Sequence, residues 1–152
     1  MTTLLHLSDL HFGQKVSSPN DGYLTSKSGA KSLANQIFTQ LNSKDVKQRI
    51  EPVSLIIISG DITDSAEPNQ YGYAKEFIQE LGSKLNLTSE KILIVPGNHD
   101  VDWNAKPNDD KFASYAQFYE GTFKETWNPA TPVVRTFKAS HDFEGICFGF
   151  NS

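Results

Sequence analysis

Three short apolar segments in the first two thirds of the chain each run directly into a cluster of polar residues. They cover residues 4–7, 53–58 and 92–95 and are rich in β-branched types. Short runs of this composition that end at Gly, Pro or polar residues favour buried strands over helices. Each of the three segments therefore predicts one strand.

Amphipathic segments separate the predicted strands. In both, apolar residues recur at the spacing of one helical face. These apolar positions are Leu33, Ala34, Ile37, Phe38 and Leu41 in the first segment, and Ala74, Phe77, Ile78, Leu81 and Leu85 in the second. Strand, helix, strand, helix, strand predicts right-handed crossovers and a parallel sheet, so the expected fold class is α/β.

The last third of the chain adds one helix and two strands to this prediction. Aromatic residues between positions 112 and 123 recur with helical spacing, and we expect the helix to begin near residues 108–110 and to end at 127–129. Strands are predicted at 133–137 and 146–150, joined by a turn-like stretch.

Composition narrows the class of protein. The chain has 152 residues, 38% of them hydrophobic and 21% charged, which fits one globular domain. A single cysteine and the lack of a long apolar segment predict a cytoplasmic protein without a membrane span. The net charge of −4 argues against binding nucleic acid by bulk charge, but it leaves open a nuclease whose metals carry the positive charge.

The polar clusters carry the candidate chemistry, because the carboxyl ends of parallel strands are where open α/β sheets place ligands. Asp9 and His11 are two residues apart, so both side chains can reach one ion from the same side of an extended chain. Asp61 follows the second strand closely, and it is the natural carboxylate to bridge two ions. Asn98 offers an amide oxygen from the third strand. The sequence thus groups candidate ligands for one ion, with a carboxylate and an amide suited to a second.

The order of these motifs identifies a family resemblance. The chain carries D-x-H at 9–11, G-D-x-x-D at 60–64 and G-N-H-D at 97–100. This series resembles the calcineurin-like metallophosphoesterase superfamily. The resemblance implies an αββα sandwich, of which this chain forms a part, with parallel strands, crossover helices and the metal site at the strand carboxyl ends.

The resemblance also implies a role for each motif residue. The implied metal ligands are Asp9 and His11 on one ion, Asp61 as the bridge and Asn98 on the other ion. His99 is implied as the proton donor or transition-state stabiliser, held in place by Asp64. Asp100 is expected to support the ligands without touching an ion.

The chain departs from the family pattern at two points. Ser65 follows Asp64 where the protein-phosphatase branch has Arg, and the run 65–71 looks like the branch of small phosphodiesterases and some nucleases. Nothing after residue 100 matches the later lone His ligand or the G-H-x-H motif of the family, and His141 is the only histidine downstream. We therefore expect the second ion to be incompletely ligated, and residues 1–152 to be the N-terminal portion of a longer phosphoesterase domain.

These observations predict a metal-dependent phosphoester hydrolase. We expect it to cleave a phosphodiester or nucleotide-like substrate, nucleic acid included, through a metal-bound hydroxide, with two divalent ions (Mn²⁺, Fe or Zn²⁺) as cofactors. The alternatives are a phosphomonoesterase and a non-catalytic metal-binding or regulatory module. The particular substrate and the oligomeric state stay open.

Four further features have structural interpretations. His6 lies inside the first strand, where a hydrogen-bonded core or interface histidine is favoured. His141 is expected at the surface, and Cys147 is expected to be an inert buried thiol. The polar stretch 14–28 predicts a long loop beside the first motif.

Overall fold

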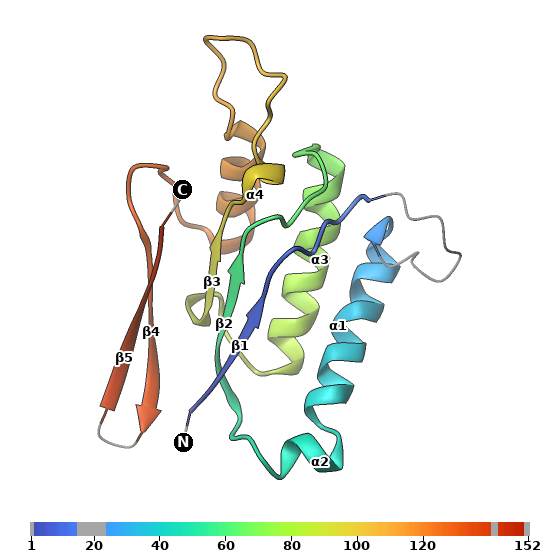
Figure 1. Ribbon diagram of the computed structural model, residues 1–152, viewed down its shortest axis with the longest axis vertical. Helices are drawn as coiled ribbons and strands as arrows, with labels where there is room; N and C mark the ends of the chain where they lie inside the picture. Colours follow the sequence, from blue (N-terminus) through green and yellow to red (C-terminus); the bar gives the residue numbers. More distant parts are fainter. Residues whose placement is uncertain (1, 15–23, 141–142, 151–152) are drawn as a thin grey trace.

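A parallel three-stranded sheet forms the centre of the protein. The computed structural model describes residues 2–14, 24–140 and 143–150 (Figure 1). The strands of this sheet, in spatial order, are β1 (Thr3–Leu7), β2 (Val53–Ser59) and β3 (Ile92–Val95). Both pairings are parallel, which confirms the predicted α/β class and the crossover connections.

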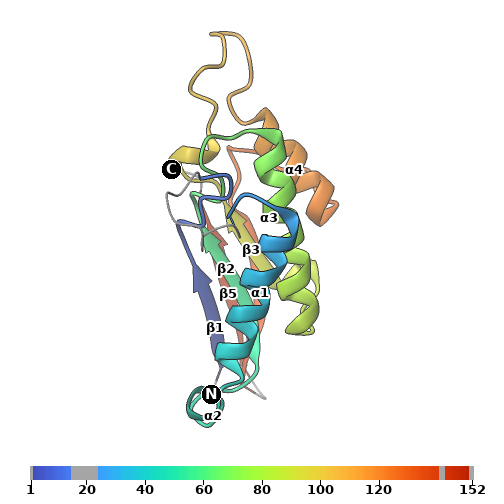
Figure 2. The ribbon, with the colours of Figure 1, turned by 90° about the vertical axis from the view of Figure 1, so that its right-hand side faces the viewer.

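Helices cover one face of the sheet (Figure 2). The helices on this face are α1 (Lys27–Leu41), α3 (Pro68–Lys84) and α4 (Ala113–Phe123). The short helix α2 (Lys44–Lys47) follows α1 beyond the end of the sheet (Figure 1), and the 3-10 turns are η2 (Ser89–Lys91) and η3 (Asn98–Asp100). The predicted apolar faces of α1 and α3 point into the core, where Ala34, Ala74 and Phe77 are fully buried. The Ser26 side chain caps α1 by accepting a hydrogen bond of 3.0 Å from the Gly29 N–H.

A second, two-stranded antiparallel sheet lies on the side of the main sheet away from α1 and α3 (Figure 1). It consists of β4 (Val133–Ser140) and β5 (Phe143–Gly149), so both strands differ in extent from the predicted 133–137 and 146–150. Gly149 lies so close to Leu93 and Val95 that a Cβ atom would clash with their side chains. The outer face of the hairpin exposes Ile146 and Phe148.

The aromatic helix ends earlier than its pattern suggests. The prediction that it runs from 108–110 to 127–129 was wrong at both ends, because α4 spans Ala113–Phe123 and Lys124 then adopts a left-handed conformation with φ 61°. Its aromatic residues nevertheless pack in the core as expected, with Tyr115 fully buried. The predicted loop 14–28 was also too long, since α1 begins at Lys27 and residues 15–23 lie outside the described part.

Three residues that we expected to have structural or surface positions are His6, Cys147 and His141. His6 is exposed on β1 rather than buried, and its Nε2 atom lies 2.6 Å from the Ser59 hydroxyl. Cys147 is half-buried rather than fully buried. His141 lies outside the described residues. No helix in the described part of the chain has the length and apolar character to cross a membrane.

Candidate metal centre

The loops that follow β1 and β2 run side by side beyond the sheet. The His11 N–H donates to the Asp61 carbonyl at 2.9 Å, and the Phe12 N–H donates to the Ile62 carbonyl at 2.9 Å. These hydrogen bonds extend the contact between the two segments past the last ladder residues. They bring the first two motifs together.

Three predicted ligands have an unusual backbone conformation. Asp9, His11 and Asp61 have φ values of 56°, 45° and 49°. The left-handed region costs a residue with a Cβ atom about 1–2 kcal/mol, so surrounding contacts must stabilise it. Gly97 provides close approach here, because a Cβ atom on it would clash with the Asp61 backbone and carboxylate. The motif glycine therefore lets the second and third loops meet.

Asp100 joins the same two loops from inside the protein. Its carboxylate has no solvent exposure and accepts hydrogen bonds from the N–H groups of Ile62, Thr63 and Gly97 at 2.9 to 3.0 Å. The Thr63 hydroxyl donates to it as well, at 2.9 Å. Burial raises the pKa of Asp100 above its ordinary value, while these N–H donors act in the opposite direction. Asp100 thus lies behind the loops and anchors their backbones.

The side chains of Asp9, His11 and Asp61 converge in front of these loops. Each offers one ligand atom, and the three atoms lie within 4.8 Å of one another. Two carboxylates and an imidazole form a donor set that suits Mn²⁺, Fe or Zn²⁺, so these residues fit a divalent ion. The Asp61 Oδ1 atom also accepts the His99 N–H at 3.0 Å. A carboxylate has about four lone-pair sites, so this hydrogen bond leaves Asp61 able to bind an ion.

The third loop places Asn98 at the exposed rim. Its backbone carbonyl accepts a hydrogen bond of 2.8 Å from the Trp103 indole. The Trp103 ring is 66% exposed, and the Lys111 ammonium lies 5.2 Å from its centroid. The amide of Asn98 and a lone pair of Asp61 are the predicted donors for a second ion, fewer than such an ion takes.

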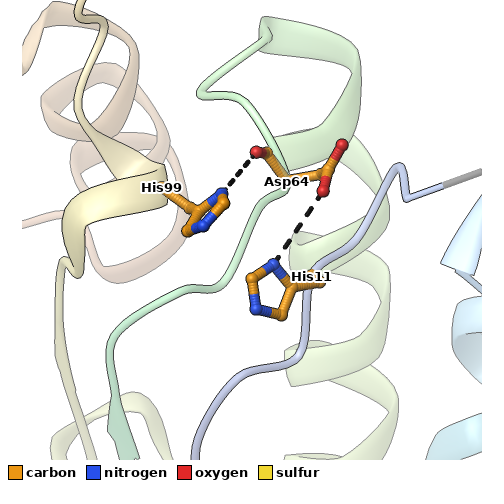
Figure 3. Close-up of side chains that lie close together, drawn as sticks. All are labelled: His11, Asp64 and His99. Atoms are coloured by element: carbon orange, nitrogen blue, oxygen red, sulfur yellow. Dashed lines mark hydrogen bonds and ion pairs between the residues drawn. The ribbon is translucent and has the colours of Figure 1, made fainter.

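His99 and Asp64 meet differently from what the resemblance suggests (Figure 3). The His99 Nδ1 atom donates to the backbone carbonyl of Asp64 at 2.7 Å. The Asp64 carboxylate is instead directed at His11, whose Nδ1 lies 4.0 Å from its Oδ1 atom. The carbonyl of Asp64 is the main cause that raises the pKa of His99, and Asp61, Asp64 and Asp100 raise it further, against the effect of burial. This hydrogen bond leaves Nε2 of His99 available to a ligand.

Sequence reasoning gave no role to Gln70, yet its side chain fixes the second loop. Gln70 is buried, and its Oε1 atom accepts from the N–H groups of Asp64 and Ser65 at 3.2 and 3.0 Å. Its side chain also fills the space where a Cβ atom of Gly13 would lie. The signal that the sequence offers is a glutamine in the first turn of the amphipathic helix that follows the second motif.

Carboxylates and imidazoles gather at the carboxyl ends of the parallel strands, where open α/β sheets bind ligands, and they form a donor set suited to divalent ions. The chain belongs to the calcineurin-like phosphoesterase family, because the model of that family matches residues 2–148. A comparison with curated proteins finds no match. Members of this family are metal-dependent phosphoester hydrolases, and the candidate ligand groups of this chain agree with that chemistry.

Proposed function

We propose that this protein hydrolyses phosphodiesters at the metal centre formed by Asp9, His11 and Asp61. The observation that carries the proposal is the convergence of these three donors beside His99. The rings of His11 and His99 have centroids 4.7 Å apart, so a group bound at the cluster lies within reach of both. Asn98 is proposed as a ligand for a second ion.

Each residue would have a distinct task in the reaction. Bound divalent ions lower the pKa of water and neutralise charge on the phosphoryl oxygens. His99 would donate a proton from Nε2 to the leaving alkoxide, since its Nδ1 proton is held by the Asp64 carbonyl. Asp100 and the N–H groups that it binds would keep the ligand loops in place during the reaction.

A cavity beside the cluster supports a diester over a monoester. Its volume is about 650 Å³, and Asp64 forms part of its wall. The lining residues are Gly13, Gln14, Thr25, Asp64, Ser65, Glu67, Asn69, Gln70 and Tyr73. None of these described lining residues is Lys or Arg, so the cavity suits an uncharged hydrogen-bonding group better than extra negative charge. A phosphodiester has such a group in its second ester substituent, whereas a phosphomonoester does not.

Calorimetry with Mn²⁺ tests the metal centre directly. We expect the full chain to bind Mn²⁺ and Asp61→Ala to abolish measurable binding, because the variant removes a central donor of the cluster. Asp45→Ala is the matched control, since Asp45 is an exposed aspartate in α2. Unchanged Mn²⁺ affinity in Asp61→Ala would show that the metal assignment is wrong.

Substrate preference tests the phosphodiesterase assignment. With Mn²⁺ present, we expect slow hydrolysis of bis-p-nitrophenyl phosphate, a higher kcat/KM for it than for p-nitrophenyl phosphate, and loss of both activities in Asp61→Ala. Slow turnover is expected because the described loops supply few donors for a second ion. A preference for the monoester would favour a phosphomonoesterase. Mn²⁺ binding without turnover of either ester would favour a binding module.

A further inference from the structure

One ring nitrogen of His11 lacks a hydrogen bond. Its Nδ1 atom is buried and has no partner among the described residues. Buried polar atoms are normally hydrogen-bonded, so an orphaned one in a candidate site needs an explanation. The Asp64 carboxylate faces this atom, with Oδ1 4.0 Å from Nδ1 (Figure 3).

Asp64 presents two different groups to the two histidines. Its backbone carbonyl accepts the His99 Nδ1–H at 2.7 Å. Its backbone N–H lies 3.1 Å from the Phe12 carbonyl and 3.2 Å from Gln70 Oε1, so the main chain is held on both sides. The carboxylate is only partly buried and has no equivalent restraint among the described residues. It can therefore move by side-chain rotation while the carbonyl stays on His99.

The other ring nitrogen of His11 is directed away from Asp64 (Figure 3). Since Nδ1 faces Asp64, we assign Nε2 to the cluster with Asp9 and Asp61. A histidine that binds a metal through one nitrogen usually donates the other N–H to a carboxylate, carbonyl or water, which fixes both tautomer and ring orientation. His11 has a carboxylate on the required side.

We propose that Asp64 is a positioning residue for His11: its carboxylate accepts the Nδ1–H of His11 and so directs Nε2 at the metal ligands Asp9 and Asp61. A separation of 4.0 Å is longer than a hydrogen bond, so the proposal requires the partly buried Asp64 side chain to rotate toward His11. This inference rests on the proposed metal centre. Asp64 then orients two histidines. Its carboxylate orients the metal ligand His11, and its backbone carbonyl orients the proton donor His99.

A different arrangement of the same residues makes a competing prediction. His11, Asp64 and His99 also offer three ligand atoms within 4.8 Å of one another. If these three held the ion directly, His99→Ala would weaken metal binding as much as Asp64→Ala. In the positioning arrangement, His99 is no ligand, and His99→Ala leaves Mn²⁺ affinity unchanged.

Mn²⁺ calorimetry on the full chain provides the first readout. Asp64→Ala removes the carboxylate but keeps the carbonyl, and we expect it to weaken Mn²⁺ binding by about 10- to 100-fold, as for other partners of metal-bound histidines. Asp64→Asn retains an oxygen acceptor and should restore most of the affinity. Asp45→Ala, which removes an exposed carboxylate in α2 outside the site, should bind as the wild type does. Wild-type affinity in Asp64→Ala, or equal losses in Asp64→Asn and His99→Ala, would overturn the proposal.

Nitrogen-15 NMR of the metal-free protein provides the second readout and does not depend on Mn²⁺ binding. We expect the proton of neutral His11 to reside on Nδ1 in the wild type and in Asp64→Asn, and to redistribute to Nε2 in Asp64→Ala. His99 should keep its Nδ1 proton in all three proteins, because its acceptor is the main chain. An unchanged His11 tautomer in Asp64→Ala would refute the inference. Absence of Mn²⁺ binding in the wild type would instead refute the proposed function, so the two failures are distinguishable.

Discussion

Two buried charged side chains, Asp100 and Arg135, each join segments that are far apart in the sequence. Asp100 is fully buried, and three backbone N–H groups of the motif loops donate to it. Arg135 is 8% exposed and joins the β4–β5 hairpin to the body of the protein. It donates from Nε to the Ile92 carbonyl at 3.0 Å and from its terminal nitrogen to Glu125 at 2.9 Å.

The two regions differ in what these charges stabilise. Asp100 stabilises loops in which Asp9 and Asp61 adopt left-handed backbone conformations, and such strain persists only when surrounding contacts determine it. Arg135 stabilises regular strands that also pack through apolar contacts such as that of Gly149 with Leu93. We therefore expect the loss of Asp100 to affect both stability and metal binding, and the loss of Arg135 to affect stability alone.

The largest expected effect follows from Asp100→Ala. The substitution leaves the N–H groups of Ile62, Thr63 and Gly97 without their acceptor in the interior. Breaking a buried charged network on one side costs about 3–5 kcal/mol, so we expect a loss of that size in the free energy of unfolding. Urea denaturation measures it, and calorimetry of the protein that remains folded should show weaker Mn²⁺ binding.

Asp109→Ala is the control for this prediction. Asp109 is an exposed aspartate in the loop before α4, and its loss should change the free energy of unfolding by less than about 0.5 kcal/mol. If Asp100→Ala were as mild as this control, the motif loops would not depend on the buried carboxylate.

A smaller effect is expected for Arg135→Met, which keeps an unbranched apolar side chain but removes the guanidinium. The hydrogen bonds to the Ile92 carbonyl and the Tyr119 hydroxyl are lost, but the Met side chain keeps the apolar packing, so we expect the free energy of unfolding to fall by about 1.5–3 kcal/mol in total. The partly exposed Glu125 can be hydrated after the change, which limits the cost. Urea denaturation should show the loss, while Mn²⁺ affinity stays at the wild-type level. A parallel fall in affinity would show that the hairpin and the motif loops are energetically coupled.

The sequence was sufficient to predict the sheet and the candidate ligands, but not the contacts of the motif loops or the end of α4. Apolar runs ending in polar clusters were sufficient to predict the parallel sheet. The spacing of Asp9 and His11 predicted a shared ion; the structure brings their ligand atoms within 4.8 Å of each other, and the ion itself stays a prediction. The contacts of Asp64 and Gln70 depend on how the second loop turns in space, which the side-chain types do not determine. The end of α4 was missed because the chain turns at Lys124 without a Gly or Pro to signal it.

The smallest expected effect is at a charge cluster on the surface. Water weakens the attraction between charges there, in contrast to the buried Asp100 and Arg135. Glu76 on α3 lies 3.1 Å from the Lys31 ammonium and 3.5 Å from that of Lys27, both on α1. The hydrogen bond from Lys31 is the main cause that lowers the pKa of Glu76 from 4.5. A carboxyl group whose pKa is lower in the folded state stabilises the fold above its unfolded pKa, and this contribution disappears as the pH falls through the folded value. We therefore expect Glu76→Gln to have a slightly lower Tm than the wild type at pH 7. This difference in Tm should vanish as the pH falls well below 4.5, and it should shrink in high salt.

Glu51→Gln, at an exposed glutamate outside this cluster, should show no such pH-dependent difference. A difference that persists unchanged at acid pH would mean that Glu76 acts through packing rather than through its charge.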